Sequence, residues 1–149
     1  MNRQEKWDLR FLKLAKEVSS WSKDPSTQVG AVIVRNVNEI VSLGYNGFPK
    51  GDLDLEEDYD NREIKYSKVI HAEINALRFA NFAVNGCTLY TYPFEPCTKC
   101  AKQFCHQGIK RVVSYEPSLE ILSRWEKSIM ESRRIFSDFG VDHFLYQLE

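Results

Sequence analysis

The sequence predicts an α/β domain in which helices cover both faces of a mixed β-sheet, as a three-layer α/β/α sandwich. An opening stretch with a helical apolar period is followed by two β-branched runs, "QVGAVIVR" and "IVSLGY". After residue 70, strand-like runs alternate with amphipathic helical stretches. Such alternation favours parallel strands with crossover helices, whereas the two earlier runs favour an antiparallel hairpin. The predicted sheet is therefore mixed.

The first half of the chain predicts a helix, a hairpin and a loop. The helix has one apolar stripe at steps of four, three, four and three residues, and "SKDPST" ends it; the stripe comprises Trp7, Phe11, Leu14, Val18 and Trp21. In the first strand, Gly30 indicates that another part of the backbone approaches closely. The stretch from Asp52 to Glu63 holds seven acidic residues among twelve, which predicts an exposed loop.

The second half predicts three helices between three strands. A helix begins at His71, and the strand "CTLYTY" follows it. Pro96 suits the first position of the next helix, which should end near Gly108. The strand "KRVVSY" leads to a long amphipathic helix, and "VDHFLYQL" predicts a final edge strand.

Composition limits the class of protein. The 149 residues fit one domain, 1–149, and the net charge of -1 without a basic run gives no footprint for nucleic acid. No apolar stretch approaches the roughly 18 residues of a membrane span, and the N-terminus lacks a secretion signal, so we expect a cytoplasmic protein. In a reducing cytoplasm its four cysteines are better explained as metal ligands, reactive thiols or core residues than as disulfides.

Two short motifs predict a zinc site. Cys97 and Cys100 share one side of the first turn of a helix, and His71 begins another helix. Two thiolates and an imidazole leave one tetrahedral position open for water, as in catalytic rather than structural zinc sites. Glu73 is then free to accept the water's proton and pass it to a leaving amine.

The combined pattern H-x-E followed by P-C-x-x-C is the signature of zinc nucleobase deaminases. A structural zinc site or a redox pair would explain "PCTKC" alone, but neither explains His71 and Glu73 at the start of a helix. The spacing of Cys87 and Cys105 favours core positions rather than ligands.

Beyond these motifs, "SKDPSTQVGAVIV", "GYNGFP", "HAEINA", "PCTKCAK" and "GIKRVV" together resemble the deoxycytidylate (dCMP) deaminases over most of the chain. The resemblance implies a cytidine deaminase-like fold and the hydrolysis of dCMP to dUMP and ammonia, which supplies dUMP for thymidylate synthesis. It implies that Glu73 is the catalytic acid and base, and that His71, Cys97 and Cys100 hold Zn²⁺.

The resemblance also implies substrate contacts. Asn46 would bind the sugar or base, and the backbone N–H of Ala72 would bind the pyrimidine carbonyl. Ser22, Lys23 and Tyr115 are candidates for the 5′-phosphate. Two alternatives stay open: Asn46 suits a left-handed turn between glycines, and Lys23 suits a solvated turn after the first helix.

Many members of this family are similar in being homohexamers that dCTP activates and dTTP inhibits. An effector would lie by resemblance near the glycine-rich turn and the following helix, at Gly44, Tyr45, Asn46, Gly47, Asn75, Arg78 and Phe79. Mg²⁺ would accompany a triphosphate at the acidic stretch, although a solvated loop also explains those acids. For Phe79, helical spacing favours core packing.

One segment departs from the family pattern. "LYTYPFEPC" is longer and richer in proline than the usual approach to the P-C-x-x-C helix, so Phe94 and Glu95 receive no assigned role. Two other classes share parts of the signature. A polynucleotide deaminase acting on tRNA or single-stranded DNA would need a cationic groove, and a non-catalytic zinc module would need a fourth protein ligand.

Overall fold

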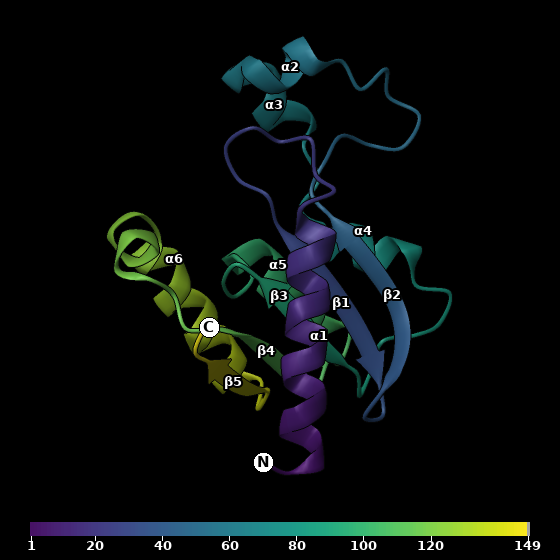
Figure 1. Cartoon of the computed structure of the whole chain (residues 1–149), viewed down its shortest axis with the longest axis vertical. Coiled ribbons are helices and arrows are strands. Elements are labelled where there is room, and N and C mark those ends of the chain that lie inside the picture. Colours follow the sequence, from purple (N-terminus) through teal and green to yellow (C-terminus); the bar gives the residue numbers. More distant parts are fainter. Residues whose placement is uncertain (149) are drawn as a thin grey trace.

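A five-stranded mixed sheet forms the centre of the protein, as the sequence predicts. The computed structural model describes residues 1–148. The strands follow the order β2-β1-β3-β4-β5, with β1 antiparallel to both β2 and β3, and with β3, β4 and β5 mutually parallel (Figure 1). In chain order the elements are α1 (Arg3–Ser19), β1 (Gly30–Arg35), β2 (Glu39–Tyr45), α2 (Glu56–Asp60), α3 (Arg62–Lys68), α4 (Ala72–Phe79), β3 (Thr88–Tyr92), α5 (Thr98–His106), β4 (Arg111–Tyr115), α6 (Leu119–Asp138) and β5 (Asp142–Tyr146).

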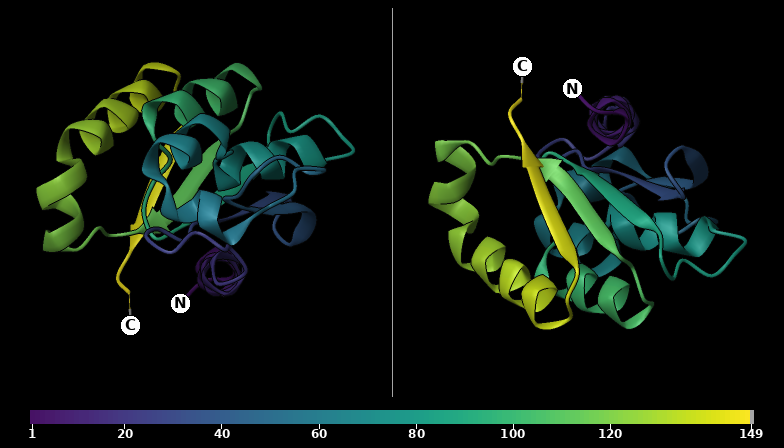
Figure 2. Two further views of the ribbon diagram at one scale, coloured as in Figure 1. Left: turned by 90° about the horizontal axis from the view of Figure 1, so that it is seen from above. Right: turned by 90° about the horizontal axis from the view of Figure 1, so that it is seen from below.

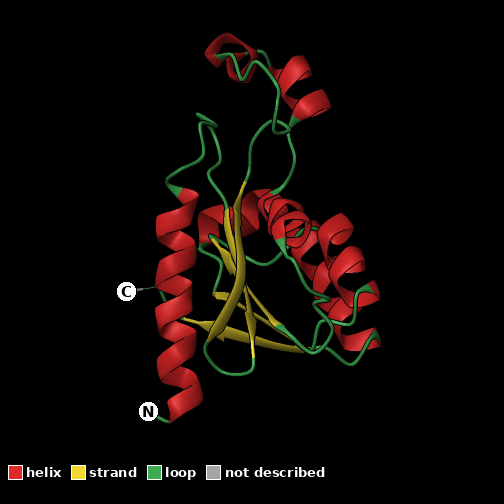
Figure 3. Ribbon diagram, turned by 90° about the vertical axis from the view of Figure 1, so that its right-hand side faces the viewer, coloured by secondary structure: helices red, strands yellow, loops and turns green. Residues whose placement is uncertain are grey.

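Helices cover both faces of the sheet, so the predicted three layers are confirmed. Helix α1 lies on one face, and α4, α5 and α6 lie on the other (Figures 2 and 3). The side chains of β1 divide between the layers because successive residues point to opposite faces. Val32 and Val34 pack with α1, whereas Ala31 and Ile33 pack with the helices on the other face. None of the described helices is long and apolar enough to cross a membrane.

Two local predictions are wrong. Pro96 is not the first helical residue of α5, because Cys97 is the N-cap and Pro96 precedes it. The acidic stretch is not a simple loop, because it contains α2 and leads into α3, which project from one end of the sheet (Figures 1 and 3). The local charge pattern does not predict these helices, because contacts with other segments stabilise them. The Tyr59 ring stacks 3.9 Å from that of Phe48, and Lys65 pairs with Asp24.

Two glycines allow helices to pack directly on the strands. A Cβ added at Gly30 of β1 would lie 2.0 Å from the carbonyl oxygen of Ala15 in α1. One added at Gly44 of β2 would lie 2.4 Å from the carbonyl oxygen of Ala72 in α4. The close approach predicted at Gly30 is confirmed. Gly44 is an effector contact by resemblance, but in the structure it is the residue that lets α4 pack closely on β2.

We therefore expect Gly30→Ala to lower the free energy of unfolding by about 1–3 kcal/mol, because the new methyl group must displace α1 backbone. Gly47→Ala is the matched control, since its Cβ would have the Tyr59 hydroxyl 3.4 Å away as its nearest neighbour. Urea unfolding followed by circular dichroism measures both. Equal stability of the two variants would contradict the packing argument.

Candidate active site

Two helix N-termini meet beside the sheet and present the predicted zinc ligands. His71 is the N-cap of α4, and Cys97 is the N-cap of α5. Neither side chain caps its own helix, although N-cap side chains commonly do so. Both side chains are therefore available to a ligand, and Cys100 joins them from the first turn of α5.

The three side chains are spaced for a metal ion. Their ligand atoms all lie within 4.8 Å of one another. The Cys97 and Cys100 sulfurs lie 3.3 and 3.4 Å from Nδ1 of His71. A tetrahedral zinc ion with Zn–S and Zn–N bonds of about 2.3 and 2.1 Å would place sulfur and nitrogen about 3.6 Å apart. The donor set and the spacing thus fit zinc, with Nδ1 as the ligating imidazole nitrogen.

The site favours a thiolate even in the metal-free protein. The hydrogen bond from Cys100 and the interaction with His71 together lower the pKa of Cys97 to about 4, against the opposing effect of burial. The same contact with Cys97 raises the pKa of His71. The Cys100 pKa is raised, because its thiol donates to Cys97 and because it is buried. One thiolate is thus already formed, and a bound cation would deprotonate the second.

Glu73 lies in the first turn of α4, two residues after His71, and its side chain is buried. Burial raises the pKa of this carboxyl group to about 7. A carboxyl group with a pKa in this range can both accept and release a proton near neutral pH. The geometry therefore suits the predicted proton shuttle.

The other two cysteines lie in the core, as predicted. Cys87 and Cys105 are buried in the cluster between the sheet and helices α4, α5 and α6. Burial raises the pKa of both thiols. Among residues 1–148 the structure brings together one possible metal cluster, formed by His71, Cys97 and Cys100.

These positions predict opposite effects of two cysteine substitutions. Cys100→Ala should lose zinc and lower the unfolding temperature, because metal that binds only the folded state stabilises it. Cys105→Ala, on the same helix, should retain one zinc per chain. Metal analysis after gel filtration, together with thermal unfolding with and without chelator, measures both effects. Retention of zinc by Cys100→Ala would contradict the ligand assignment.

Two cavities lie near one end of the sheet. The first has a volume of about 460 Å³ and borders the "GYNGFPKG" turn, β2 and α4. Five of the seven residues proposed for an effector line it: Tyr45, Asn46, Gly47, Asn75 and Phe79. Phe79 is half-exposed there rather than packed in the core. Gly44 and Arg78 do not line this cavity.

The second cavity has a volume of about 700 Å³ and lies between the end of α1, the segment after β3 and the start of α6. Its lining includes Lys16, Lys23, Tyr92, Phe94 and Trp125. The Phe94 and Trp125 rings are stacked with centroids 6.3 Å apart. Phe94, which received no role from the sequence, therefore forms part of a cavity wall just before the zinc-ligand loop.

Two of the candidate substrate residues, Asn46 and Ser22, form hydrogen bonds with the loop that follows α1. The Asn46 side chain accepts from the Val29 N–H at 2.9 Å and donates to the Thr27 carbonyl at 2.8 Å. The Ser22 hydroxyl donates to the Asn46 carbonyl at 2.8 Å. Both residues are buried, so they hold the loop after α1 against the end of β2.

Asp24 is the centre of this loop's hydrogen bonds. Its Oδ1 accepts the N–H groups of Ser26 and Thr27 at 2.8 and 3.1 Å, and the ammonium of Lys65 lies 3.1 Å from the same oxygen. Asp24 and Lys65 are both buried. The projecting α3 helix thereby holds the loop in place, which sequence spacing did not reveal.

The remaining candidates are dispersed. Lys23 is exposed, pairs with Asp54 at 2.5 Å and lines both cavities. Tyr115 is buried in the α1-side core, with its ring edge-on to that of Tyr92, and lines neither cavity. Ala72 is buried at the first position of α4, where helices leave backbone N–H groups unpaired. In the acidic stretch, Asp52 and Asp58 both pair with Lys68.

Comparison with known proteins agrees with this geometry. A family model described as the cytidine and deoxycytidylate deaminase zinc-binding region matches residues 5–116, which include the three candidate ligands and Glu73. An uncharacterized deaminase in the luxG 3′ region of Aliivibrio fischeri is 48% identical over 92% of this chain and 91% of its own length. The deoxycytidylate deaminase of mouse is 43% identical over 72% of this chain but only 63% of its own length.

A solved structure has the same fold. The crystal structure of a dCMP deaminase from the cyanophage S-TIM5, in complex with dCMP and dUMP, has a TM-score of 0.72 at 25% identity and covers 97% of this chain and 98% of its own. The family model describes a zinc-binding region, which agrees with the His/Cys/Cys cluster. The chain therefore belongs to the cytidine and deoxycytidylate deaminase family, and it is a zinc-dependent hydrolytic deaminase.

Proposed function

We propose that the protein hydrolyses dCMP to dUMP and ammonia. The observation that carries this proposal is the buried Glu73 carboxyl group beside a three-ligand cluster of His71, Cys97 and Cys100. The named relatives and the complex of the cyanophage enzyme with dCMP and dUMP support this substrate among the pyrimidines. The dUMP formed would be available for thymidylate synthesis.

In this mechanism the chain's residues orient the base and move protons. When bound, zinc supplies the Lewis acidity that makes water a competent nucleophile at neutral pH. Glu73 takes one proton from the water as its oxygen attacks C4 and delivers that proton to N3 of the ring. It then takes the second proton from the oxygen now bound to C4 and delivers it to the amine, which leaves as ammonia while the C4 carbonyl of dUMP forms. The Ala72 backbone N–H holds the pyrimidine carbonyl, so that C4 faces the attacking oxygen. Burial of Glu73 supports both directions of proton transfer, because its pKa lies near the working pH.

Ammonia release and the accompanying ultraviolet change test the proposal, with dCMP, deoxycytidine, dCTP and single-stranded DNA as substrates. Turnover of dCMP well above that of the other three would support it. Turnover of the oligonucleotide alone would assign the protein to the polynucleotide deaminases. Absence of turnover in a zinc-loaded protein would support the non-catalytic zinc module.

We further propose that dCTP activates and dTTP inhibits the enzyme, as a homohexamer with Mg²⁺ on the triphosphate. The first cavity supports an effector site, because it combines aromatic walls with the cation Lys50 and a glycine-rich turn. Rate-versus-dCMP curves measured with and without each triphosphate and Mg²⁺, beside light scattering for mass, test this. Unchanged curves would refute the regulation.

A further inference from the structure

The segment between β3 and α5 leads directly to the thiolate ligands, and its residue Glu95 has no role in the chemistry described above. The Glu95 side chain is completely buried, two residues before Cys97. Nε of Arg133 in α6 donates to Oε1 of Glu95 at 2.6 Å. We propose that Glu95 and Arg133 are positioning residues: through their ion pair, α6 fixes the segment that carries Cys97 and so sets the geometry of the zinc ligands.

The ion pair depends on a single contact. Oε2 of Glu95 and Nη2 of Arg133 are buried, and neither has a hydrogen-bond partner within residues 1–148. The carboxylate therefore has the Arg133 Nε as its compensation in the described part of the chain. A buried carboxylate that loses its cation keeps an uncompensated charge in the interior, which is strongly unfavourable. Arg133 thus determines whether Glu95 can stay buried beside the zinc-ligand loop.

The residue before Glu95 is attached to the same helix. The Thr91 hydroxyl at the end of β3 donates to the Phe94 carbonyl at 2.9 Å, and the Phe94 ring stacks on Trp125 of α6 with centroids 6.3 Å apart. Glu95 adds the contact with Arg133, further along α6. The segment is therefore held to β3 by its backbone and to α6 by two successive side chains.

These contacts adjoin the ligands along the chain. Only Pro96 lies between Glu95 and Cys97. The proline ring fixes φ, so this connection has few ways to absorb a displacement of the Glu95 carboxylate. Cys97 is the N-cap of α5, and its carbonyl accepts the Ala101 N–H at 2.8 Å. A shift of Cys97 would therefore also disturb the first turn of α5, which carries Cys100.

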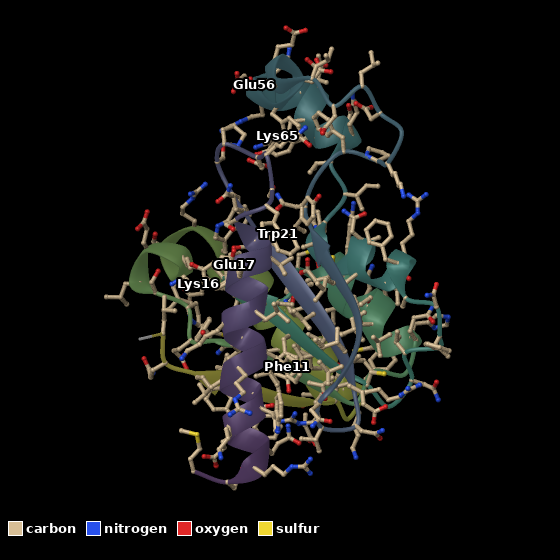
Figure 4. The ribbon with its side chains drawn as sticks, turned by 45° about the vertical axis from the view of Figure 1, so that its right-hand side comes forward. Phe11, Lys16, Glu17, Trp21, Glu56 and Lys65 are labelled. Carbon is tan, nitrogen blue, oxygen red and sulfur yellow. The ribbon has the colours of Figure 1, made fainter. Side chains whose placement is uncertain are left out.

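Its position distinguishes this ion pair from the other buried ones. Within residues 1–148, three acids whose side chains are at most 4% exposed form ion pairs: Asp8, Asp24 and Glu95. Asp24 pairs with Lys65 of α3, at the projecting end of the molecule (Figure 4). Asp8 joins α1 to β4 through Arg111. Of the three acids, Glu95 alone lies within two residues of a zinc ligand in the sequence.

The test measures the metal site without turnover. Competition with a chelator gives the zinc affinity, and replacement of Zn²⁺ by Co²⁺ gives absorption bands that report the arrangement of the thiolate ligands. We expect Glu95→Gln and Arg133→Met each to weaken zinc binding roughly tenfold and to shift the cobalt bands, because groups that hold a ligand in place tune the metal. Arg133→Lys, which keeps the charge but loses the guanidinium geometry, should retain part of the affinity.

Asp8→Asn is the matched control, because it also breaks a buried ion pair with an arginine. It should destabilise the fold but leave the zinc affinity and the cobalt bands unchanged, since apparent affinity falls only when the folded fraction falls. Wild-type affinity and bands in both Glu95→Gln and Arg133→Met would overturn the proposal, and so would changes of equal size in Asp8→Asn. If Arg133→Met does not fold, Glu95→Gln decides. Neither readout uses a substrate, so the result is independent of whether the enzyme acts on dCMP.

Discussion

Replacing Glu73 with alanine should reduce ammonia release from dCMP by roughly 100- to 10,000-fold, because a positioned acid and base contributes that much to a proton-transfer step. The carboxyl group is buried, so water from bulk solvent cannot readily take over its role. Steady-state kinetics of the zinc-loaded variant measure the effect. The fall should appear in kcat, since proton transfer occurs after the substrate has bound.

Measurements of metal content and folding distinguish a loss of proton transfer in Glu73→Ala from a loss of structure. Glu73 is not among the three predicted ligands, so the variant should retain one zinc per chain and should still bind dUMP. Glu73→Gln is the matched variant, because it keeps the shape of the side chain and loses the titrating group. If Glu73→Gln kept most of the activity, another residue would have to carry the proton.

The zinc cluster could be predicted from the sequence because the residues of each of its two motifs lie close together in the chain. His71 and Glu73 are two residues apart, Cys97 and Cys100 are three apart, and each pair begins a helix whose apolar pattern is visible in the sequence. Only the contact between the N-termini of the two helices depends on tertiary structure. That contact follows from the alternation of strands and helices, which brings the two helices onto the same face of the sheet. The strand and helix order was predicted for the same reason.

The second cavity could not be predicted in this way. Lys16 and Arg124, which line it, are more than a hundred residues apart, and each is an ordinary charged residue on an amphipathic helix. Lys23, which the motif favoured, is instead paired with Asp54 of a segment that sequence reasoning treated as solvated. Similarly, Lys65 becomes a buried partner of Asp24 only because α3 folds back over the loop after α1.

A second network far from these sites should dominate stability. Asp8 of α1 is completely buried, and the Arg111 guanidinium donates to both of its oxygens at 3.2 and 2.9 Å. The hydroxyls of Tyr90 and Tyr146 donate to the same carboxylate at 2.6 and 2.8 Å. These partners lie 82, 103 and 138 residues away in sequence, on β3, β4 and β5, so no local pattern identifies Asp8.

Asp8→Asn should lower the free energy of unfolding by about 3 kcal/mol near neutral pH, because it leaves the largely buried guanidinium of Arg111 without its counter-ion. Urea unfolding measures the change. Asp138→Asn is the control, since Asp138 pairs with Arg134 in an exposed ion pair on α6 and its removal should change the midpoint little. Loss of similar size in both variants would contradict a special role for the buried network.

The pH dependence of the same pair gives an independent check. Burial alone would raise the pKa of Asp8, but the hydrogen bonds from Arg111, Tyr90 and Tyr146 outweigh it and lower the pKa below 3.8. A carboxyl group with a lowered pKa in the folded state stabilises the protein above its unfolded pKa, and this contribution is lost as the pH falls through the folded value. The stability difference between wild type and Asp8→Asn should therefore stay constant from about pH 7 to pH 5 and narrow below about pH 4. A difference that stayed constant into strong acid would mean that the Asp8 charge is not what holds α1 to the parallel strands.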